Sequence, residues 1–114
     1  MSEAAMSEDK KISLDLMRQA AGQACDVLRI LANEDRLLLL CQLSLGEKAV
    51  GELEAALGIH QPTLSQQLAV LRSDGLVNTR REGKRIFYSI ADPNVLALLE
   101  VLYQLYCPQQ EEVA

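Results

Sequence analysis

The sequence predicts a mainly α-helical domain that carries a single β-hairpin, and two observations support this fold class. Residues 49–73 have the apolar spacing of two short helices joined by a glycine turn. A basic stretch with alternating apolar residues, 76–90, follows directly and is typical of a hairpin. A hairpin in this place forms a wing, so we expect a winged helix-turn-helix with five helices.

The composition is that of a single domain. The chain has 114 residues, enough for its own core, and no apolar run long enough to span a membrane. We expect residues 1–11 to be a disordered acidic leader, 12–107 the domain, and 108–114 a polar tail. The N-terminus lacks the pattern of a signal peptide and the cysteines number three, so we expect a cytoplasmic protein with free thiols.

Two helices are expected before the helix-turn-helix. The second, residues 34–45, can be capped by Asn33 and is apolar on nearly all sides, which predicts the central helix of the core. The first, residues 12–31, can be capped by Ser13. Its apolar residues share one face: Leu14, Met17, Ala21, Ala24, Val27, Leu28 and Leu31.

The helix-turn-helix consists of a helix at about 49–57, a turn at Gly58, and a second helix that runs to Ser73 with Pro62 in its first turn. Small and amide side chains on the outer face of the second helix can enter a major groove and read base edges. These are Gln61, Thr63, Ser65, Gln66 and Gln67, and the first four are the candidate DNA-binding residues of this helix. Helix hairpins of this kind also occur in proteins that bind no nucleic acid, so the prediction depends on the hairpin that follows.

That hairpin is expected to have strands at 76–80 and 85–90 and a turn at 81–84. Residues 58–90 carry a net charge of +3, whereas the rest of the chain carries −8. A basic wing can contact phosphates or enter the minor groove, although most charged turns are simply solvated. The side chains that we expect to contact DNA are Arg80, Arg81, Lys84 and Arg85.

The last helix is expected at 93–107, with Asp92 as its cap and Pro93 in its first turn. It is more apolar than one domain requires, and a large apolar surface marks a partner surface. We therefore expect a homodimer through the first and last helices. Its interface residues are predicted to be Leu14, Met17, Leu99, Leu102, Tyr103 and Tyr106.

Three segments, 28–43, 50–77 and 80–90, together resemble the ArsR/SmtB family of bacterial winged-helix repressors. The resemblance implies a repressor, rather than an enzyme, that binds double-stranded operator DNA as a homodimer. The family usually has serine where this chain has His60. The metal-binding pattern of the family is absent, because Ala49 and Gly51 stand at its cysteine positions and 92–107 contains no histidine. No metal site or cofactor is therefore expected.

The cysteines resemble those of the persulfide-sensing branch of the family, the SqrR/BigR type, to which HlyU is related. Cys41 and Cys107 match its two sensor positions, and Cys25 has no counterpart. The resemblance implies that the reduced dimer binds DNA and that a persulfide or polysulfide inducer links the two sulfurs. Alternatives are that the cysteines are ordinary core residues, or that they bind a soft metal or haem.

Overall fold

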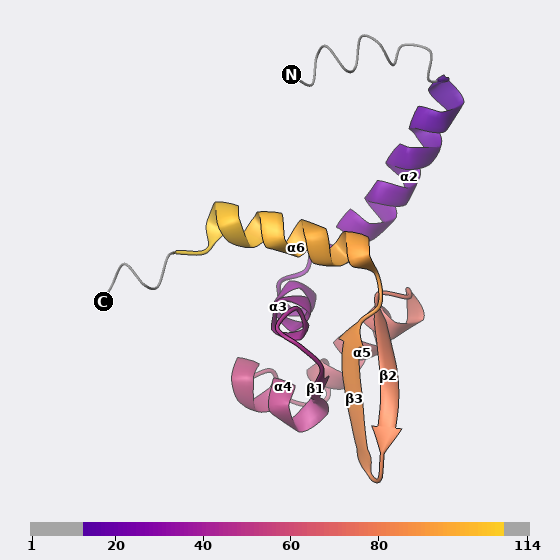
Figure 1. Cartoon of the computed structure of the whole chain (residues 1–114). Helices are drawn as coiled ribbons and strands as arrows, with labels where there is room; N and C mark the ends of the chain where they lie inside the picture. Colours follow the sequence, from indigo (N-terminus) through magenta and orange to yellow (C-terminus); the bar gives the residue numbers. More distant parts are fainter. Residues whose placement is uncertain (1–12, 109–114) are drawn as a thin grey trace.

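The computed structural model describes residues 13–108, which form five helices and a three-stranded antiparallel sheet (Figure 1). This confirms the predicted winged helix-turn-helix. The predicted leader and residues 109–114 of the predicted tail lie outside the described residues. The elements in chain order are α2 (Leu14–Leu31), α3 (Glu34–Leu43), β1 (Lys48–Ala49), α4 (Val50–Leu57), α5 (Thr63–Ser73), β2 (Val77–Glu82), β3 (Arg85–Ile90) and α6 (Pro93–Tyr106).

Three of the helices begin at the predicted capping residues. The side chains of Ser13, Asn33 and Asp92 each accept a hydrogen bond from a backbone N–H in the first turn of α2, α3 and α6. Such caps typically contribute about 1 kcal/mol each. The start of α4 differs, because the Glu52 carboxylate accepts the backbone N–H of Ala49 at 2.7 Å.

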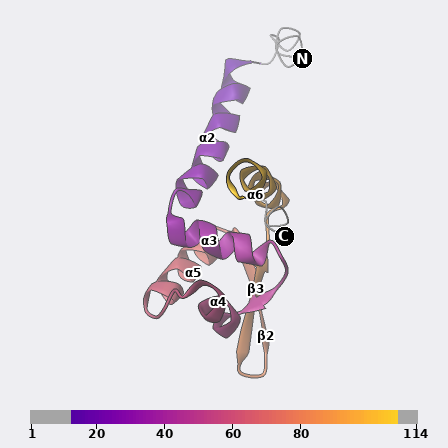
Figure 2. The same ribbon diagram turned by 90° about the vertical axis from the view of Figure 1, so that its left-hand side faces the viewer.

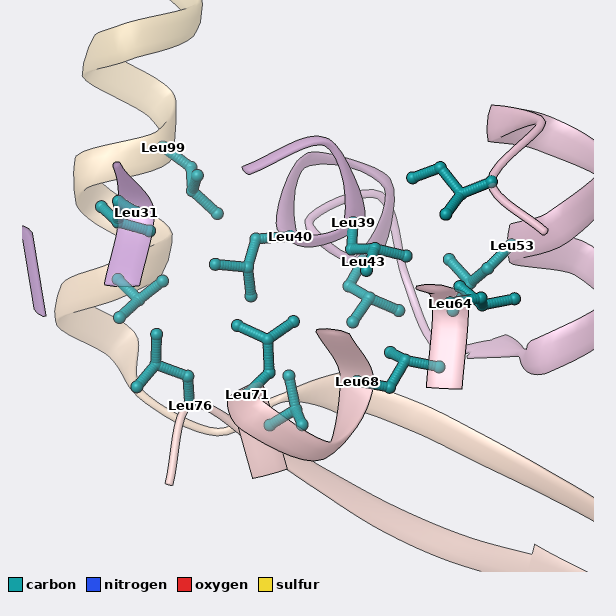
Figure 3. Packing of buried hydrophobic residues seen from close by; sticks show 13 residues of the cluster. Leu31, Leu39, Leu40, Leu43, Leu53, Leu64, Leu68, Leu71, Leu76 and Leu99 are labelled. Atoms are coloured by element: carbon teal, nitrogen blue, oxygen red, sulfur yellow. The ribbon is translucent and has the colours of Figure 1, made fainter. Parts of the chain in front are cut away.

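The core is a cluster of aliphatic side chains around α3 (Figure 3). Leu39 and Leu40 of α3 are fully buried, as are Leu53 of α4 and Leu64 of α5. The helix contacts α2, α4, α5 and β3, as expected for a central helix. It ends at Leu43 rather than at residue 45, and it is not buried on every side, because Leu38 is 40% exposed.

The sheet contains one strand that the sequence did not predict. Its order is β1-β3-β2, and β1 pairs with β3 through Lys48↔Tyr88 and Ala49↔Phe87. Two residues are too few to show an alternating pattern, so only the pairing reveals the strand. The wing is also longer than predicted, because β2 continues to Glu82 and the turn narrows to Gly83, with φ of 64°, and Lys84.

Much of α2 and α6 carries exposed apolar side chains. Helix α2 extends away from the other elements, and only its C-terminal end meets the core (Figures 1 and 2). Leu14 and Met17 are 62% and 48% exposed, and Tyr103 and Tyr106 of α6 are 53% and 78% exposed. Leu99 corrects the predicted interface: it is 2% exposed within the chain's own core, because it points from α6 towards α3. No helix within residues 13–108 is long and apolar enough to cross a membrane.

Candidate functional site

Helix α5 has a buried face and an exposed face, and the division between them positions the side chains predicted to read DNA. Leu64, Leu68 and Leu71 are buried against the core, which fixes the rotation of the helix. Ser65 and Gln66 consequently face solvent. An exposed amide and hydroxyl on one helix face can both donate and accept hydrogen bonds at base edges.

The side chains at the start of α5 have local roles as well. Thr63 is half-buried, and Gln61 is exposed but its Oε1 accepts the backbone N–H of Ser65 at 3.1 Å. This bond supplies the capping oxygen that His60 does not provide. The imidazole Nδ1 of His60 instead lies 3.1 Å from a carboxylate oxygen of Glu54.

Gln67, which the sequence placed on the same polar face, is half-buried and makes a contact within the chain. Its Oε1 accepts a hydrogen bond from the Arg36 guanidinium at 3.0 Å, and Arg36 also donates to the backbone carbonyl of Ile30 at 2.9 Å. Arg36 thus connects the end of α2 and the start of α3 to the middle of α5. Sequence reasoning missed this contact because the two partners are 31 residues apart and neither carries a distinctive local signal.

The basic wing is partly neutralised within the chain, because Arg80 is held in an ion pair. Its guanidinium donates to both carboxylate oxygens of Glu47, at 2.8 and 2.9 Å, and lies 3.7 Å from Glu82. The hydrogen bonds that Arg80 donates to Glu47 raise the pKa of Arg80. Arg80 therefore fastens the wing to the loop before β1 and is not available as a free cation.

The other basic side chains of the wing differ from Arg80. Within residues 13–108 no carboxylate lies at ion-pair distance from Arg81, Lys84 or Arg85. Two guanidinium groups lie over the ring of Phe87. Their central carbons are 4.6 Å (Arg80) and 4.9 Å (Arg85) from the ring centroid. The wing therefore presents three cations without an ion-pair partner in the described residues: Lys84 in its turn, Arg81 on β2 and Arg85 on β3.

The structure brings Cys41 and Cys107 into one pocket of the same chain. Cys41 lies in the last turn of α3 and Cys107 directly follows α6. Both line a pocket of about 690 Å³ between these helices. Cys25 is exposed on α2 and does not line it. The other lining residues are Leu38, Gln42, Ser44, Leu45, Leu96, Glu100, Tyr103 and Gln104.

The two pocket cysteines differ in their surroundings. Burial raises the pKa of the Cys41 thiol, and the nearby Cys107 raises that pKa further. Cys41 is half-buried, whereas Cys107 is exposed. Because Cys107 is exposed, its sulfur is the more accessible nucleophile once it is deprotonated, since the thiolate is the reactive form of cysteine. Cys41 lies close enough to Cys107 for the two groups to interact electrostatically. No group of three or more His, Cys, Asp or Glu side chains in the described part of the chain is arranged to hold a metal ion.

Comparison with known proteins agrees with this architecture. A family model described as "Bacterial regulatory protein, arsR family" matches residues 33–79, which include α3, α4 and α5. The "Biofilm growth-associated repressor" of Agrobacterium fabrum is 48% identical over 90% of this chain and 88% of its own length. This chain belongs to the ArsR family of bacterial regulatory proteins.

Solved structures of other ArsR-family proteins share its fold. The crystal structure of the transcriptional repressor BigR from Xylella fastidiosa is 44% identical, with a TM-score of 0.79, over 86% of this chain and all of that one. Reduced HlyU from Vibrio cholerae is 45% identical, with a TM-score of 0.79, over 83% of this chain and all of that one. A homodimeric winged helix-turn-helix DNA-binding domain from Mycobacterium bovis is 36% identical, with a TM-score of 0.68, over 82% of this chain and 87% of that one. The match to BigR and HlyU assigns this ArsR-family protein to their branch.

Proposed function

We propose that this protein is a thiol-based transcriptional repressor. As a reduced homodimer it binds double-stranded operator DNA, and it releases the DNA when Cys41 and Cys107 become linked by a persulfide or polysulfide. The observation that carries the proposal is the shared pocket: two cysteines 66 positions apart line one cavity of one chain. Membership of the BigR and HlyU branch of the ArsR family supports a regulatory use of that pocket.

The proposed DNA contacts follow from the exposed side chains. Gln66 and Ser65, with Gln61 and Thr63 at the start of α5, read base edges in the major groove. The unpaired cations of the wing contact phosphates and position the protein without reading sequence. The related BigR is named a repressor and the related HlyU an activator. The direction of regulation thus depends on where the operator lies relative to the promoter, and repression follows where the two overlap.

The cross-link can be written with an organic trisulfide, R–S–S–S–R, as the inducer. The Cys107 thiolate attacks the central sulfur and one R–S⁻ leaves. The Cys41 thiolate then attacks the same sulfur and displaces the second R–S⁻, which leaves a trisulfide between the two cysteines. The protein thiols are oxidised and the inducer is reduced to two thiolates, so no other oxidant is needed. A direct disulfide requires Cα atoms within about 7 Å, and an inserted sulfur relaxes this limit.

Release of DNA follows from the positions of the two cysteines. A link between α3 and α6 joins the helix that supports α5 to one of the two helices proposed to form the dimer. Tying them together changes the angle between each α5 and the dimer axis, so the two recognition helices no longer match their half-sites. A coupling free energy of about 1–3 kcal/mol would weaken operator binding about 5–150-fold.

The test is a mobility-shift titration of the promoter region of the chain's own gene with the reduced protein, before and after treatment with a neutral organic trisulfide. The expected result is loss of binding together with a mass gain of one sulfur less two hydrogens per chain. Cys41→Ser and Cys107→Ser proteins should bind DNA and lose the response, whereas Cys25→Ser should keep it. A retained response in Cys41→Ser would overturn the proposed switch. An absorbance titration with haem tests the alternative ligand.

A further inference from the structure

Both pocket cysteines lie at the C-terminal ends of helices. Cys41 is in the last turn of α3, and the backbone N–H of Cys107 donates to the Tyr103 carbonyl as the cap of α6. The C-terminus of a helix carries a partial negative charge of about half an elementary charge. Neither helix has a basic side chain in its last turn that would offset this charge. The backbone therefore makes the pocket electrostatically negative.

The side chains that line the pocket act in the same direction. Leu38, Leu45 and Leu96 are apolar, and glutamine, serine and tyrosine supply the neutral polar groups. Among the lining residues only Glu100 is charged, and its charge is negative. The whole chain carries a net charge of −5. No cation of the lining is available to receive a carboxylate or another anion.

Such a site differs from the usual reactive cysteine. Thiols activated for reaction with small oxidants lie at helix N-termini or beside cations, which stabilise the thiolate. Here burial and the neighbouring Cys107 favour the neutral thiol of Cys41. The reaction therefore depends on the electrophile entering the pocket, and entry is opposed for an anion and unopposed for a neutral molecule.

We propose that this pocket selects uncharged organic polysulfides with small substituents over anionic ones such as carboxylate-bearing polysulfides. The inference rests on the proposed function, because it names the class of inducer that acts at the same two cysteines. The leucines and the neutral polar groups of the lining receive the substituents. Glu100 and the two helix ends repel an anion before it reaches Cys107.

Two trisulfides test the selectivity: bis(2-hydroxyethyl) trisulfide, which is neutral, and bis(2-carboxyethyl) trisulfide, which is anionic. The reduced full-length protein is treated with each, and loss of the Cys107 thiol is followed by quenching and peptide mass spectrometry. Each rate is divided by the rate of the same probe with N-acetylcysteine amide. We expect the neutral probe to exceed the anionic one about 3–10-fold at low salt, with a smaller ratio at high salt.

A matched pair of variants assigns the effect to the pocket. Glu100→Gln should reduce the neutral-to-anionic ratio about 2–3-fold. Glu34→Gln removes the same charge at the opposite end of α3 and should leave the ratio unchanged. Equal normalised rates for the neutral and anionic probes in the wild-type protein, or equal effects of the two variants, would overturn the inference.

The same experiment separates this inference from the proposed function. If both probes cross-link the cysteines and release DNA at equal normalised rates, the selectivity is wrong and the switch stands. If the neutral probe is preferred at Cys107 but no cross-link forms and DNA stays bound, the switch is wrong and the selectivity stands. Failure of both probes to modify Cys107 overturns both proposals.

Discussion

The side chains that carry the chemistry of this protein are defined by their immediate neighbours as much as by their type. Arg80 and Lys84 are both cations of the wing, yet Arg80 is held by Glu47 and Lys84 has no such partner within the described residues. Cys41 and Cys25 are both free thiols, yet only Cys41 is half-buried beside a second cysteine. Each contrast leads to a measurable difference.

Removal of Lys84 should reduce the salt dependence of DNA binding more than removal of Arg80 does. In Lys84→Ala, the slope of log K against log salt should flatten by about 2 per dimer, because each phosphate contact contributes about 0.9. Arg80→Ala should flatten it less, since its charge is already paired with Glu47 in the free protein. Binding titrations at several salt concentrations measure both. Arg18→Ala on α2 is the control, and equal slopes for the Arg80 and Lys84 variants would contradict the assigned roles.

Alkylation of Cys41 should require a higher pH than alkylation of an exposed cysteine. Its raised pKa reduces the thiolate fraction near neutral pH, and only the thiolate reacts. The Cys107→Ser substitution removes the electrostatic effect of Cys107 on the pKa of Cys41, so the pH profile of Cys41 alkylation should move to lower pH. Burial of Cys41 should still keep this profile above that of an exposed thiol. Iodoacetamide labelling at a series of pH values, read by mass spectrometry, measures the shift. A profile below that of an exposed thiol would show that burial does not raise the pKa of Cys41.

At the scale of elements, the recognition helix is held by contacts on both sides. Its buried leucines pack on α3, and Gln67 accepts a hydrogen bond from Arg36, which also holds the carbonyl of Ile30 at the end of α2. Adjacent glutamines of α5 thus have different tasks. Gln66 is exposed and available to DNA, whereas Gln67 fixes the helix to the α2–α3 junction.

Alanine at these two positions should separate stability from recognition. Gln67→Ala leaves a half-buried guanidinium N–H without its acceptor, so the free energy of unfolding should fall by about 1–3 kcal/mol. Gln66→Ala should change it by less than about 0.5 kcal/mol and reduce the preference for operator over random DNA. Urea unfolding and competition mobility shifts measure the two effects. Equal destabilisation by both variants would show that the Arg36 contact does not hold α5.

For the whole molecule, α2 and α6 present an exposed apolar surface, which is typical of a partner interface. Val101 and Leu105 of α6 are 52% and 69% exposed, and Leu16 and Leu28 of α2 are 57% and 51% exposed. A related winged helix-turn-helix domain from Mycobacterium bovis is described as homodimeric. We propose the same association here, with the exposed members of the predicted interface and without the buried Leu99.

A charge on this surface should break the dimer. In Val101→Glu, burial of an unpaired carboxylate opposes association, so sedimentation should report a monomer at concentrations where the wild-type protein is a dimer. Circular dichroism at low temperature checks that the chain remains folded. Ala55→Glu, on exposed α4, is the control and should stay dimeric. A dimeric Val101→Glu protein would exclude this face of α6 from the interface.

The sequence alone determined the features that depend on near neighbours. Capping residues, the 3.6-residue spacing of leucines and the glycine turns predicted the helices and the wing, because these signals act within a few positions along the chain. Resemblance to known sequences added the pairing of Cys41 with Cys107, which no local pattern could supply.

Only the tertiary structure decided the contacts between distant segments. The Arg80–Glu47 pair joins residues 33 positions apart, and the Arg36–Gln67 bond joins residues 31 apart. Strand β1 exists only because β3 lies beside it, and Leu99 is buried only because α6 packs on the core cluster. The sequence gives the charge and apolarity of each side chain directly. The neighbour that neutralises or buries it depends on how distant segments pack in the folded chain.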